Sequence, residues 1–257
     1  MSYLEKTFGL NGRRAVVTGA GRGIGRGVAE ALAACGAEVA VHYNSSREEA
    51  EEVVQGISES GGRAWCAQAD LTESAQVTRF FQQVQERWGA QDILVNNTGD
   101  LIRRARVEEY PDELLEDVLR VNIHSALYSI RSAAPLLRLG NDPCIVNLSS
   151  VAAHNGGGPG AVVYAATKGA IHTATRGLSK ELAPEIRVNG IAPGIIVTDF
   201  HRKHSTPEFL ETMKQQTPLK RLGVAEDCAS AVVFLCSRGA SFITGEVVEV
   251  NGGIWLA

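Results

Sequence analysis

Tyr164 and Lys168 stand four positions apart in the segment VVYAATKGA. On a helix, residues at this spacing lie on one face, one turn apart. A cation beside a phenol favours the phenolate and lowers the phenol's pKa from about 10, which lets a tyrosine exchange a proton near neutral pH. Taken alone, the pair also fits an exposed lysine beside a half-buried tyrosine. Its interpretation therefore depends on what else the chain contains.

A glycine-rich stretch, AVVTGAGRGIGRGVAEAL, fills positions 15–32 and has the pattern of a strand, a tight turn and a helix. Gly19, Gly23 and Gly25 would let the turn bring backbone N–H groups onto a phosphate at the start of the helix. A turn without a ligand is the alternative, but the position after the first strand favours nucleotide binding. The spacing is T-G-x-x-x-G-x-G, from Thr18 to Gly25, and differs from the G-x-G-x-x-G pattern.

Short apolar runs alternate with longer amphipathic stretches along the chain. This alternation predicts an α/β fold with a doubly wound parallel sheet and helices on both faces. Nearly continuous, β-branched strands fit burial on two sides. The predicted strands are 14–18, 38–43, 63–67, 92–96, 144–149, 187–191 and 246–250, and the predicted helices are 23–35, 46–60, 72–88, 111–139, 161–183 and 225–236.

No linker, charge block or internal repeat interrupts this pattern, so we predict one domain over residues 1–257. The glycine-rich segment 154–160 and the segment 199–220 are expected to form loops or lids, the second one closing over substrate. Ligands of open α/β sheets bind beyond the carboxyl ends of the strands. Several candidate residues follow predicted strands directly, so we expect the site at that edge.

The composition is that of an ordinary globular protein, with 44% hydrophobic and 21% charged residues and a net charge of −4. This mild acidity argues against a nucleic-acid or anionic-membrane partner. The sequence MSYLEKTFGLNGRR lacks the apolar run of a signal peptide, and no stretch approaches the roughly 20 apolar residues of a membrane span. The five cysteines are scattered and show no C-x-x-C pair, which suits a reducing compartment. A cytoplasmic location is therefore expected.

Further motifs follow in order along the chain: Asn96-Asn97-Thr98-Gly99, Asn122, Ser149-Ser150 and Pro193-Gly194. Together with the glycine turn and Tyr164-x-x-x-Lys168, they make the chain resemble the short-chain dehydrogenase/reductase family from Phe8 to about Gly253. The resemblance implies a single Rossmann-type domain with a seven-stranded parallel sheet. It also implies a nicotinamide coenzyme, a small carbonyl or alcohol substrate, and assembly as a homotetramer.

The resemblance also implies the catalytic roles. Tyr164 would exchange a proton with the substrate oxygen, and Lys168 would supply positive charge and hold the nicotinamide ribose. Ser150 would orient and polarise the carbonyl through a hydrogen bond, and Asn122 would hold a water that completes a relay to Lys168. Ser150 precedes Tyr164 by fourteen positions, where the family commonly has thirteen. An extra residue in the loop 154–163 would absorb this difference.

The end of the second predicted strand bears on the choice of coenzyme. An acidic residue there would bind the ribose of NAD and repel a 2′-phosphate, whereas this chain has Tyr43-Asn44-Ser45-Ser46-Arg47. Arg22 and Arg47 could supply positive charge, so we expect NADP(H) to be favoured over NAD(H). The alternative is that both arginines are surface residues. The expected coenzyme contacts are Gly19, Arg22, Gly23, Ile24, Gly25, Tyr43, Asn44, Ser45, Asp70, Leu71, Asn96, Tyr164, Lys168, Pro193, Gly194 and Thr198.

Some of these expected contacts have a second explanation. Asp70 matches the family residue that contacts the adenine, but it could also cap the helix that follows Thr72. Thr198 stands where the family contacts the nicotinamide carboxamide, but it could also be a helix N-cap. Thr98 replaces the family's usual alanine and adds bulk and a hydroxyl near the coenzyme.

The variable segments carry the information on substrate. Arg103, Arg104 and Arg106 could receive an anionic group, although a solvated surface paired with the acidic residues that follow is the simpler reading. Asp199, His201 and His204 have helical spacing, but hydride chemistry needs no metal, so no metal site is predicted.

Three functions stay open. General similarity favours a 3-oxoacyl-thioester reductase-like enzyme, whereas the polar lid suggests a sugar, polyol or sugar-acid dehydrogenase. A non-catalytic NADP(H)-sensing protein is a third reading, from a different class. Loss of Tyr164 or Lys168 would have favoured the sensor, and neither residue is lost.

Overall fold

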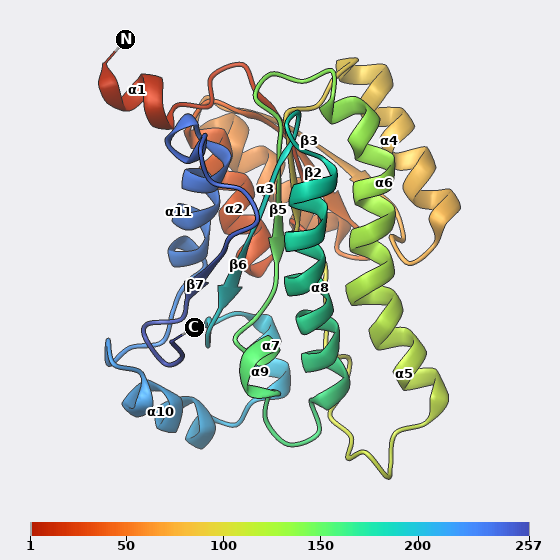
Figure 1. Cartoon of the computed structure of the whole chain (residues 1–257), viewed down its shortest axis with the longest axis vertical. Helices are drawn as coiled ribbons and strands as arrows, with labels where there is room; N and C mark the ends of the chain where they lie inside the picture. The colour runs from red at the N-terminus through yellow and green to blue at the C-terminus, as the bar shows by residue number, and fades with distance from the viewer. Residues whose placement is uncertain (1, 257) are drawn as a thin grey trace.

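One parallel sheet of seven strands forms the centre of the molecule. The computed structural model describes residues 2–256, and its strands lie in the order β3-β2-β1-β4-β5-β6-β7 (Figure 1). This confirms the predicted α/β fold with a doubly wound, seven-stranded parallel sheet. The strands are β1 (Arg14–Val17), β2 (Glu38–Tyr43), β3 (Arg63–Gln68), β4 (Ile93–Asn96), β5 (Cys144–Leu148), β6 (Arg187–Pro193) and β7 (Val247–Val250).

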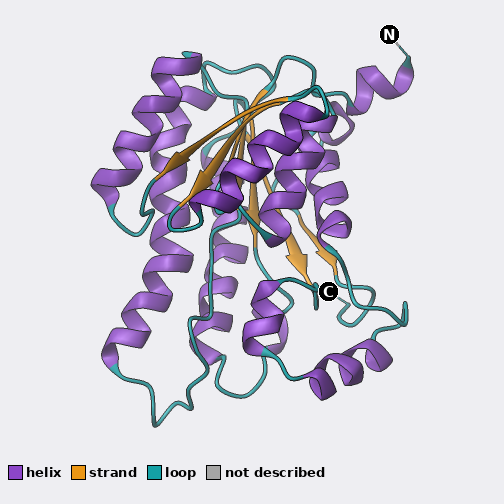
Figure 2. Ribbon diagram, turned by 180° about the vertical axis from the view of Figure 1, so that it is seen from behind, coloured by secondary structure: helices purple, strands orange, loops and turns teal. Residues whose placement is uncertain are grey.

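Helices cover both faces of the sheet, as Figure 2 shows with the strands in orange between purple helices. On one face, α2 (Gly23–Ala34), α3 (Arg47–Glu59) and α11 (Ala225–Cys236) bury a core that includes Val28, Leu32 and Leu235. On the other face, α4 (Ser74–Trp88), α6 (Ser125–Leu137) and α8 (Val162–Glu181) pack over the sheet. Every residue of β4 and β5 is buried, because side chains on both faces of these central strands enter a core.

The predicted helix at 111–139 is interrupted where Asn122 lies. The structure has α5 (Asp112–Leu119), a π-helical turn at Arg120–His124 and then α6. Such wide turns occur mostly as single insertions and frequently at functional sites. This one faces α8, the helix that carries Tyr164 and Lys168.

The segment predicted as loops or lids at 199–220 contains two short helices, α9 (Asp199–His204) and α10 (Pro207–Gln216). Thr206 caps α10 by accepting a hydrogen bond from the Phe209 N–H at 3.2 Å, and Pro207 occupies the first turn, where its missing N–H costs nothing. Three other short helices also lie outside the predicted elements: α1 (Tyr3–Phe8), α7 (Ala152–Asn155) and the 3₁₀ turn Arg238–Ala240.

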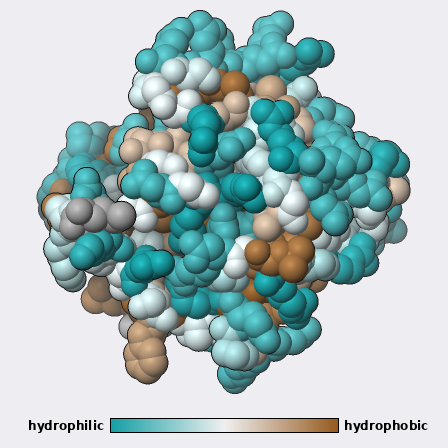
Figure 3. Space-filling view, turned by 90° about the horizontal axis from the view of Figure 1, so that it is seen from above, coloured by the Kyte–Doolittle hydropathy of each residue, from teal (hydrophilic) through white to brown (hydrophobic). Residues whose placement is uncertain are grey.

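The two ends of the strands face different surroundings. At the amino ends, the surface seen in Figure 3 is mainly hydrophilic with small separate apolar areas. At the carboxyl ends, α7, α9, α10 and the long loops gather, at the bottom of Figure 1. Within residues 2–256, no helix is long and apolar enough to cross a membrane.

Candidate active site

The glycine turn after β1 is held by two side chains from neighbouring strands. Gly19 has φ +60°, its N–H donates to Nδ1 of His42 at 3.0 Å, and its carbonyl accepts from Nδ2 of Asn97 at 2.9 Å. The Gly19 N–H is thus engaged by His42, and the predicted contact of Gly19 with the coenzyme stays a prediction. Gly19 shapes the turn, since only glycine adopts this backbone without strain.

The start of α2 remains available to an anion. Arg22 is the N-cap residue and its side chain forms no capping bond, so the first-turn N–H groups at Gly23, Ile24 and Gly25 keep their donor capacity. Gly23 has φ +58°, and a Cβ placed there would lie 3.5 Å from Thr198. The structure thus brings the glycine turn next to the segment that follows Pro193 and Gly194.

The end of β2 offers polar groups but no carboxylate between positions 43 and 46. Asn44 and Ser45 are exposed, and Arg22 is exposed and forms no ion pair within the described chain. Arg47 is paired with Glu51 through a 2.8 Å bond on the surface of α3, which offsets part of its charge. The Tyr43 side chain packs in the core instead, so its predicted role as a coenzyme contact gains no support from its position.

Two further expected coenzyme contacts are engaged with their neighbours. Asp70 accepts from both the N–H and the hydroxyl of Thr72, at 2.9 and 2.7 Å, and α4 begins only at Ser74, so Asp70 is not its N-cap. Leu71 is buried. Nδ2 of Asn96 donates to Oδ1 of Asn147 on β5 at 2.9 Å, which turns this side chain along the sheet. The coenzyme contacts expected of these residues stay predictions.

Tyr164, Ser150 and Lys168 come together where β5 ends against α8. The Lys168 ammonium is buried, donates to the Leu148 carbonyl at 3.0 Å and lies 5.6 Å from the centre of the Tyr164 ring. The Ser150 side chain lies close enough to the phenol to act on its pKa, and its Oγ accepts from the Ala152 N–H at 3.1 Å. The hydroxyl of Ser149 instead donates to the Lys168 carbonyl at 3.1 Å, so Ser150 is the serine that faces the tyrosine.

The side chains of Asn122 and Lys168 both lie beside Gly99. Its Nδ2 donates to the carbonyls of Asp100 and Val118 at 2.7 and 2.9 Å, which fixes the amide and leaves Oδ1 buried without a partner among the described residues. A Cβ placed at Gly99 would lie 2.6 Å from Oδ1 of Asn122 and 2.9 Å from Nζ of Lys168. The chain therefore brings all four predicted catalytic residues into one site.

Burial disfavours the charged form of both groups of the Tyr164–Lys168 pair. It raises the pKa of Tyr164 to about 12, with a smaller contribution in the same direction from the Asp100 charge, while the Ser150 hydrogen bond acts against the rise. Burial also lowers the pKa of Lys168 to about 8. The side chains of this chain alone therefore do not lower the pKa of the Tyr164 phenol, contrary to what the sequence predicts.

The helix α9, in the segment predicted to be a lid, packs against Tyr164. The Phe200 ring is centred 5.7 Å from the Tyr164 ring, and Asp100 holds the helix through Nε2 of His204 at 3.1 Å and Nζ of Lys203 at 3.4 Å. Arg104 donates to the His204 carbonyl at 3.1 Å and to the Pro159 carbonyl at 2.9 Å, which joins the lid to the glycine-rich loop.

The three residues considered for a metal point in different directions. Asp199 pairs with Arg202, His201 bonds to Ser205, and His204 bonds to Asp100. Across residues 2–256 the structure shows no cluster of three or more His, Cys, Asp or Glu that could hold a metal ion.

The residues of the groove fit a dinucleotide. Oγ1 of Thr98 and Oδ1 of Asn122 are buried and have no hydrogen-bond partner in the described part of the chain. A buried polar atom without a partner is costly; a ligand rich in hydroxyl groups could satisfy Oγ1 of Thr98, and a water could donate to Oδ1 of Asn122. The uncapped start of α2 adds a site for the phosphates.

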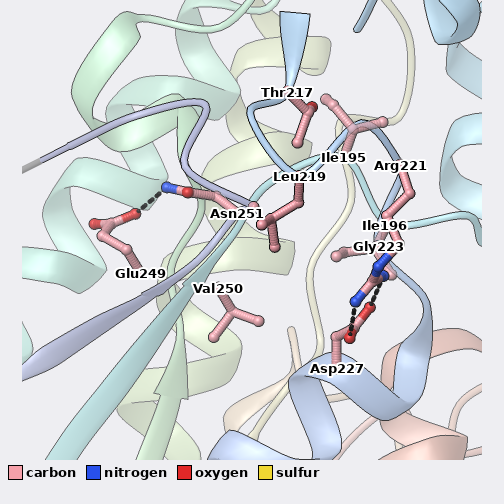
Figure 4. Close-up of a pocket in the computed structure, with 11 residues that line it drawn as sticks. Ile195, Ile196, Thr217, Leu219, Arg221, Gly223, Asp227, Glu249, Val250 and Asn251 are labelled. Carbon is pink, nitrogen blue, oxygen red and sulfur yellow. Dashed lines mark hydrogen bonds and ion pairs between the residues drawn. The ribbon is translucent and has the colours of Figure 1, made fainter. Parts of the chain in front are cut away.

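A cavity of about 190 Å³ lies apart from Tyr164, between the segment after β6 and the residues that follow β7. Figure 4 shows that its charged groups are already paired. Arg221 forms two bonds with Asp227, at 2.6 and 2.7 Å, and Glu249 accepts from Asn251 at 2.9 Å. We therefore assign no chemistry to this cavity.

Comparisons with known proteins agree with this geometry. A family model described as Enoyl-(Acyl carrier protein) reductase matches residues 19–255. The 3-oxoacyl-[acyl-carrier-protein] reductase of Staphylococcus aureus is 38% identical over 249 residues, which cover 95% of this chain and 98% of that protein. This chain belongs to the short-chain dehydrogenase/reductase family. As a member of this family it is an oxidoreductase with a nicotinamide coenzyme.

Solved structures of short-chain dehydrogenases/reductases superpose on nearly the whole chain. A 7α-hydroxysteroid dehydrogenase complexed with NADH and 7-oxo glycochenodeoxycholic acid has a TM-score of 0.93 and 33% identity, with 98% of both chains covered. A gluconate 5-dehydrogenase from Burkholderia cenocepacia, in complex with NADP and tartrate, has a TM-score of 0.91 and 32% identity, again with 98% of both chains covered. These relatives carry different coenzymes and different substrate classes.

Sequence reasoning missed three residues of the site: His42, Asn97 and Asp100. Asn97 was available from the motif, since it lies beside Asn96, but which of the two amides would reach the glycine turn depends on the direction in which each leaves the strand. His42 and Asp100 carried no motif, and only the packing of distant segments shows their contacts.

Proposed function

We propose that this chain reduces a ketone to a secondary alcohol with Tyr164 as the proton donor, and that its substrate is a 3-oxoacyl thioester. The observation that carries the proposal is the convergence of Ser150, Tyr164, Lys168 and Asn122 at the end of β5. Four side chains from three elements meet there, with an amide oxygen and an ammonium directed at one point.

Each of the four side chains has its own part in the proton transfer. The coenzyme, when bound, supplies the hydride. Tyr164 is held protonated by burial, so it can donate its proton to the substrate oxygen, and the Ser150 hydroxyl orients that oxygen. Lys168 lies beside the phenol and can restore the proton through a water held by Oδ1 of Asn122. The lid residue Phe200 excludes water from the reacting groups.

A small apolar cleft beside Tyr164 supports an acyl substrate. Leu101, Leu114, Val118 and Val163 line it, and Arg103 is the one charged residue on its wall. The cleft has a volume of only about 10 Å³, so its apolar walls could contact an alkyl chain along the surface without enclosing it, and the exposed guanidinium could meet an anionic carrier group. The similarity to the 3-oxoacyl-[acyl-carrier-protein] reductase of Staphylococcus aureus favours the same substrate class.

A sugar-acid substrate is the second candidate. The similar gluconate 5-dehydrogenase acts on such a compound by name, and His201 and His204 of this chain pack against Phe200, whose ring lies beside Tyr164. These polar groups could bind hydroxyls of a small substrate under the lid.

We also propose that NADPH is preferred to NADH. Arg22 is exposed at the start of α2, and the end of β2 carries Asn44 and Ser45 in place of an acidic residue. A guanidinium can bind a 2′-phosphate with two hydrogen bonds, and no carboxylate there repels it.

The test is the decay of coenzyme absorbance with NADPH and with NADH, measured against acetoacetyl thioesters, keto-sugars and keto-sugar acids, with polyols in the reverse direction. Thioester turnover with NADPH supports the proposal. Turnover confined to sugar compounds replaces the thioester by the second candidate. Tight coenzyme binding with no turnover on any of these compounds would instead support a coenzyme-sensing protein.

A further inference from the structure

His42 lies next to the carboxyl end of β2 and is 1% exposed. Its ring packs edge-to-face against Phe80 of α4, with centroids 5.2 Å apart. A buried imidazole keeps its place only when its nitrogens find partners, so the two bonds of this ring are informative.

The two ring nitrogens have opposite roles. Nδ1 accepts from the Gly19 N–H at 3.0 Å, and Nε2 lies 2.9 Å from the Ala69 carbonyl, which can only accept. The ring must therefore be neutral, with its proton on Nε2. Burial lowers the pKa of His42 to about 4, which is consistent with a neutral ring at physiological pH.

These bonds join two segments that both border the predicted coenzyme groove. One segment is the glycine turn, where the His42 carbonyl also accepts from the Ala20 N–H at 2.9 Å. The other is the end of β3, where Ala69 directly precedes Asp70 and Leu71. On the other side of Gly19, Nδ2 of Asn97 donates to the Gly19 carbonyl, so both the N–H and the carbonyl of Gly19 are bonded to side chains.

We propose that His42 is a positioning residue for the coenzyme, which sets the glycine turn in its binding conformation by accepting the Gly19 N–H. Without this acceptor, the buried Gly19 N–H would lack a partner and the turn would rotate to find one. The inference rests on the proposed use of a nicotinamide coenzyme, but it makes no assumption about the substrate.

Three substitutions separate the two bonds. His42→Asn places an amide oxygen near the position of Nδ1 and keeps the Gly19 contact, whereas His42→Gln places an amide nitrogen near Nε2 and keeps the Ala69 contact. His42→Leu keeps neither. The dissociation constants of NADPH and NADH are measured by fluorescence titration of each folded variant, together with its thermal stability.

We expect His42→Asn to bind the preferred coenzyme within about threefold of the wild type. His42→Gln and His42→Leu should raise the dissociation constant by about tenfold or more, as for the loss of one buried hydrogen bond. The KM for coenzyme should rise together with the dissociation constant, while kcat at saturating coenzyme changes little. Equal affinities in all variants, with only stability changed, would show that His42 has a structural role alone and would overturn the inference.

A second measurement uses the wild-type protein and so tests the inference even if the variants fail to fold. In the wild-type protein, nitrogen-15 NMR of the histidines should show His42 protonated on Nε2 only, with Nδ1 accepting a hydrogen bond. A proton on Nδ1 would contradict the inference directly. If the wild type binds neither NADPH nor NADH, the proposed function fails instead, and the two failures are thus distinguishable.

Discussion

At the scale of single residues, burial favours the protonated form of Tyr164, the proposed proton donor. Burial raises the pKa of Tyr164 to about 12 and lowers that of Lys168 to about 8, because it disfavours the charged form of each group. A protonated phenol is what reduction needs, because the substrate oxygen must receive a proton. The reverse reaction needs the phenolate and hence additional positive charge nearby, which oxidised nicotinamide would supply.

The coenzyme preference also depends on one residue. Arg22→Ala removes the exposed guanidinium at the start of α2 without touching the core. We expect the KM for NADPH to rise by about tenfold, the usual effect of losing a hydrogen bond to a charged group, with the KM for NADH unchanged. Arg47→Ala is the matched control, because Arg47 is paired with Glu51 and should contribute less to NADPH binding. Equal effects on both coenzymes would show that the 2′-phosphate is bound elsewhere.

At the scale of elements, the lid and the proton relay share one residue. The Asp100 carbonyl accepts from Asn122, while its carboxylate holds His204 and Lys203 of α9. Asp100 also raises the pKa of Tyr164 through its charge, and that carboxyl itself has a lowered pKa, with burial acting against several stabilising contacts. We therefore propose that lid closure and the protonation of the phenol are coupled through the same side chain.

Asp100→Asn tests this coupling. The amide keeps the backbone contact with Asn122 but loses the ion pairs, so we expect the KM for substrate to rise by roughly threefold to tenfold as the lid loosens. The alkaline limb of kcat/KM for reduction should move to lower pH, because removal of the negative charge lowers the pKa of Tyr164. Lys203→Met is the control, since its ammonium is largely exposed and its loss leaves Asp100 in place. An unchanged pH profile in Asp100→Asn would contradict the coupling.

Sequence patterns predicted the elements that obey a simple period and missed those set by distant contacts. All seven strands were found, because apolar β-branched runs bounded by polar turns mark buried strands. The wide turn at Asn122 could not be found, since its sequence RVNIH continues a helical pattern. The helices α9 and α10 were expected only as loops or lids, because they are short and polar.

The site itself was predicted in part. The four catalytic residues were predicted from their spacing and from the family resemblance, and the structure brings all four together. The contact of His42 with Gly19 depends on the pairing of β1 with β2, in which Val17 lies beside Val41, and no local pattern reports that register. The burial that raises the pKa of Tyr164 comes from the fold, so the spacing of Tyr164 and Lys168 alone did not indicate it.

At the scale of the whole molecule, we propose that the chain assembles as a homotetramer. Apolar side chains remain exposed on the helices that would pair and at the C-terminal end: Leu127 on α6, Val162 on α8, Trp255 and Leu256. Light scattering coupled to gel filtration should give a mass near four times the 27.4 kDa chain. Val162→Glu should reduce the assembled mass, because a charge on a buried apolar interface is costly. A wild-type monomer at micromolar concentration would contradict the proposal.

The most direct test of the account is the rate of NADPH oxidation by Tyr164→Phe with a 3-oxoacyl thioester. The substitution keeps the ring under Phe200 and removes only the proton that is donated. We predict that turnover falls by about 10²- to 10⁴-fold, while the dissociation constant of NADPH stays within about twofold of the wild type. Turnover within tenfold of the wild type would show that another group donates the proton, and the assignment of Tyr164 would be wrong.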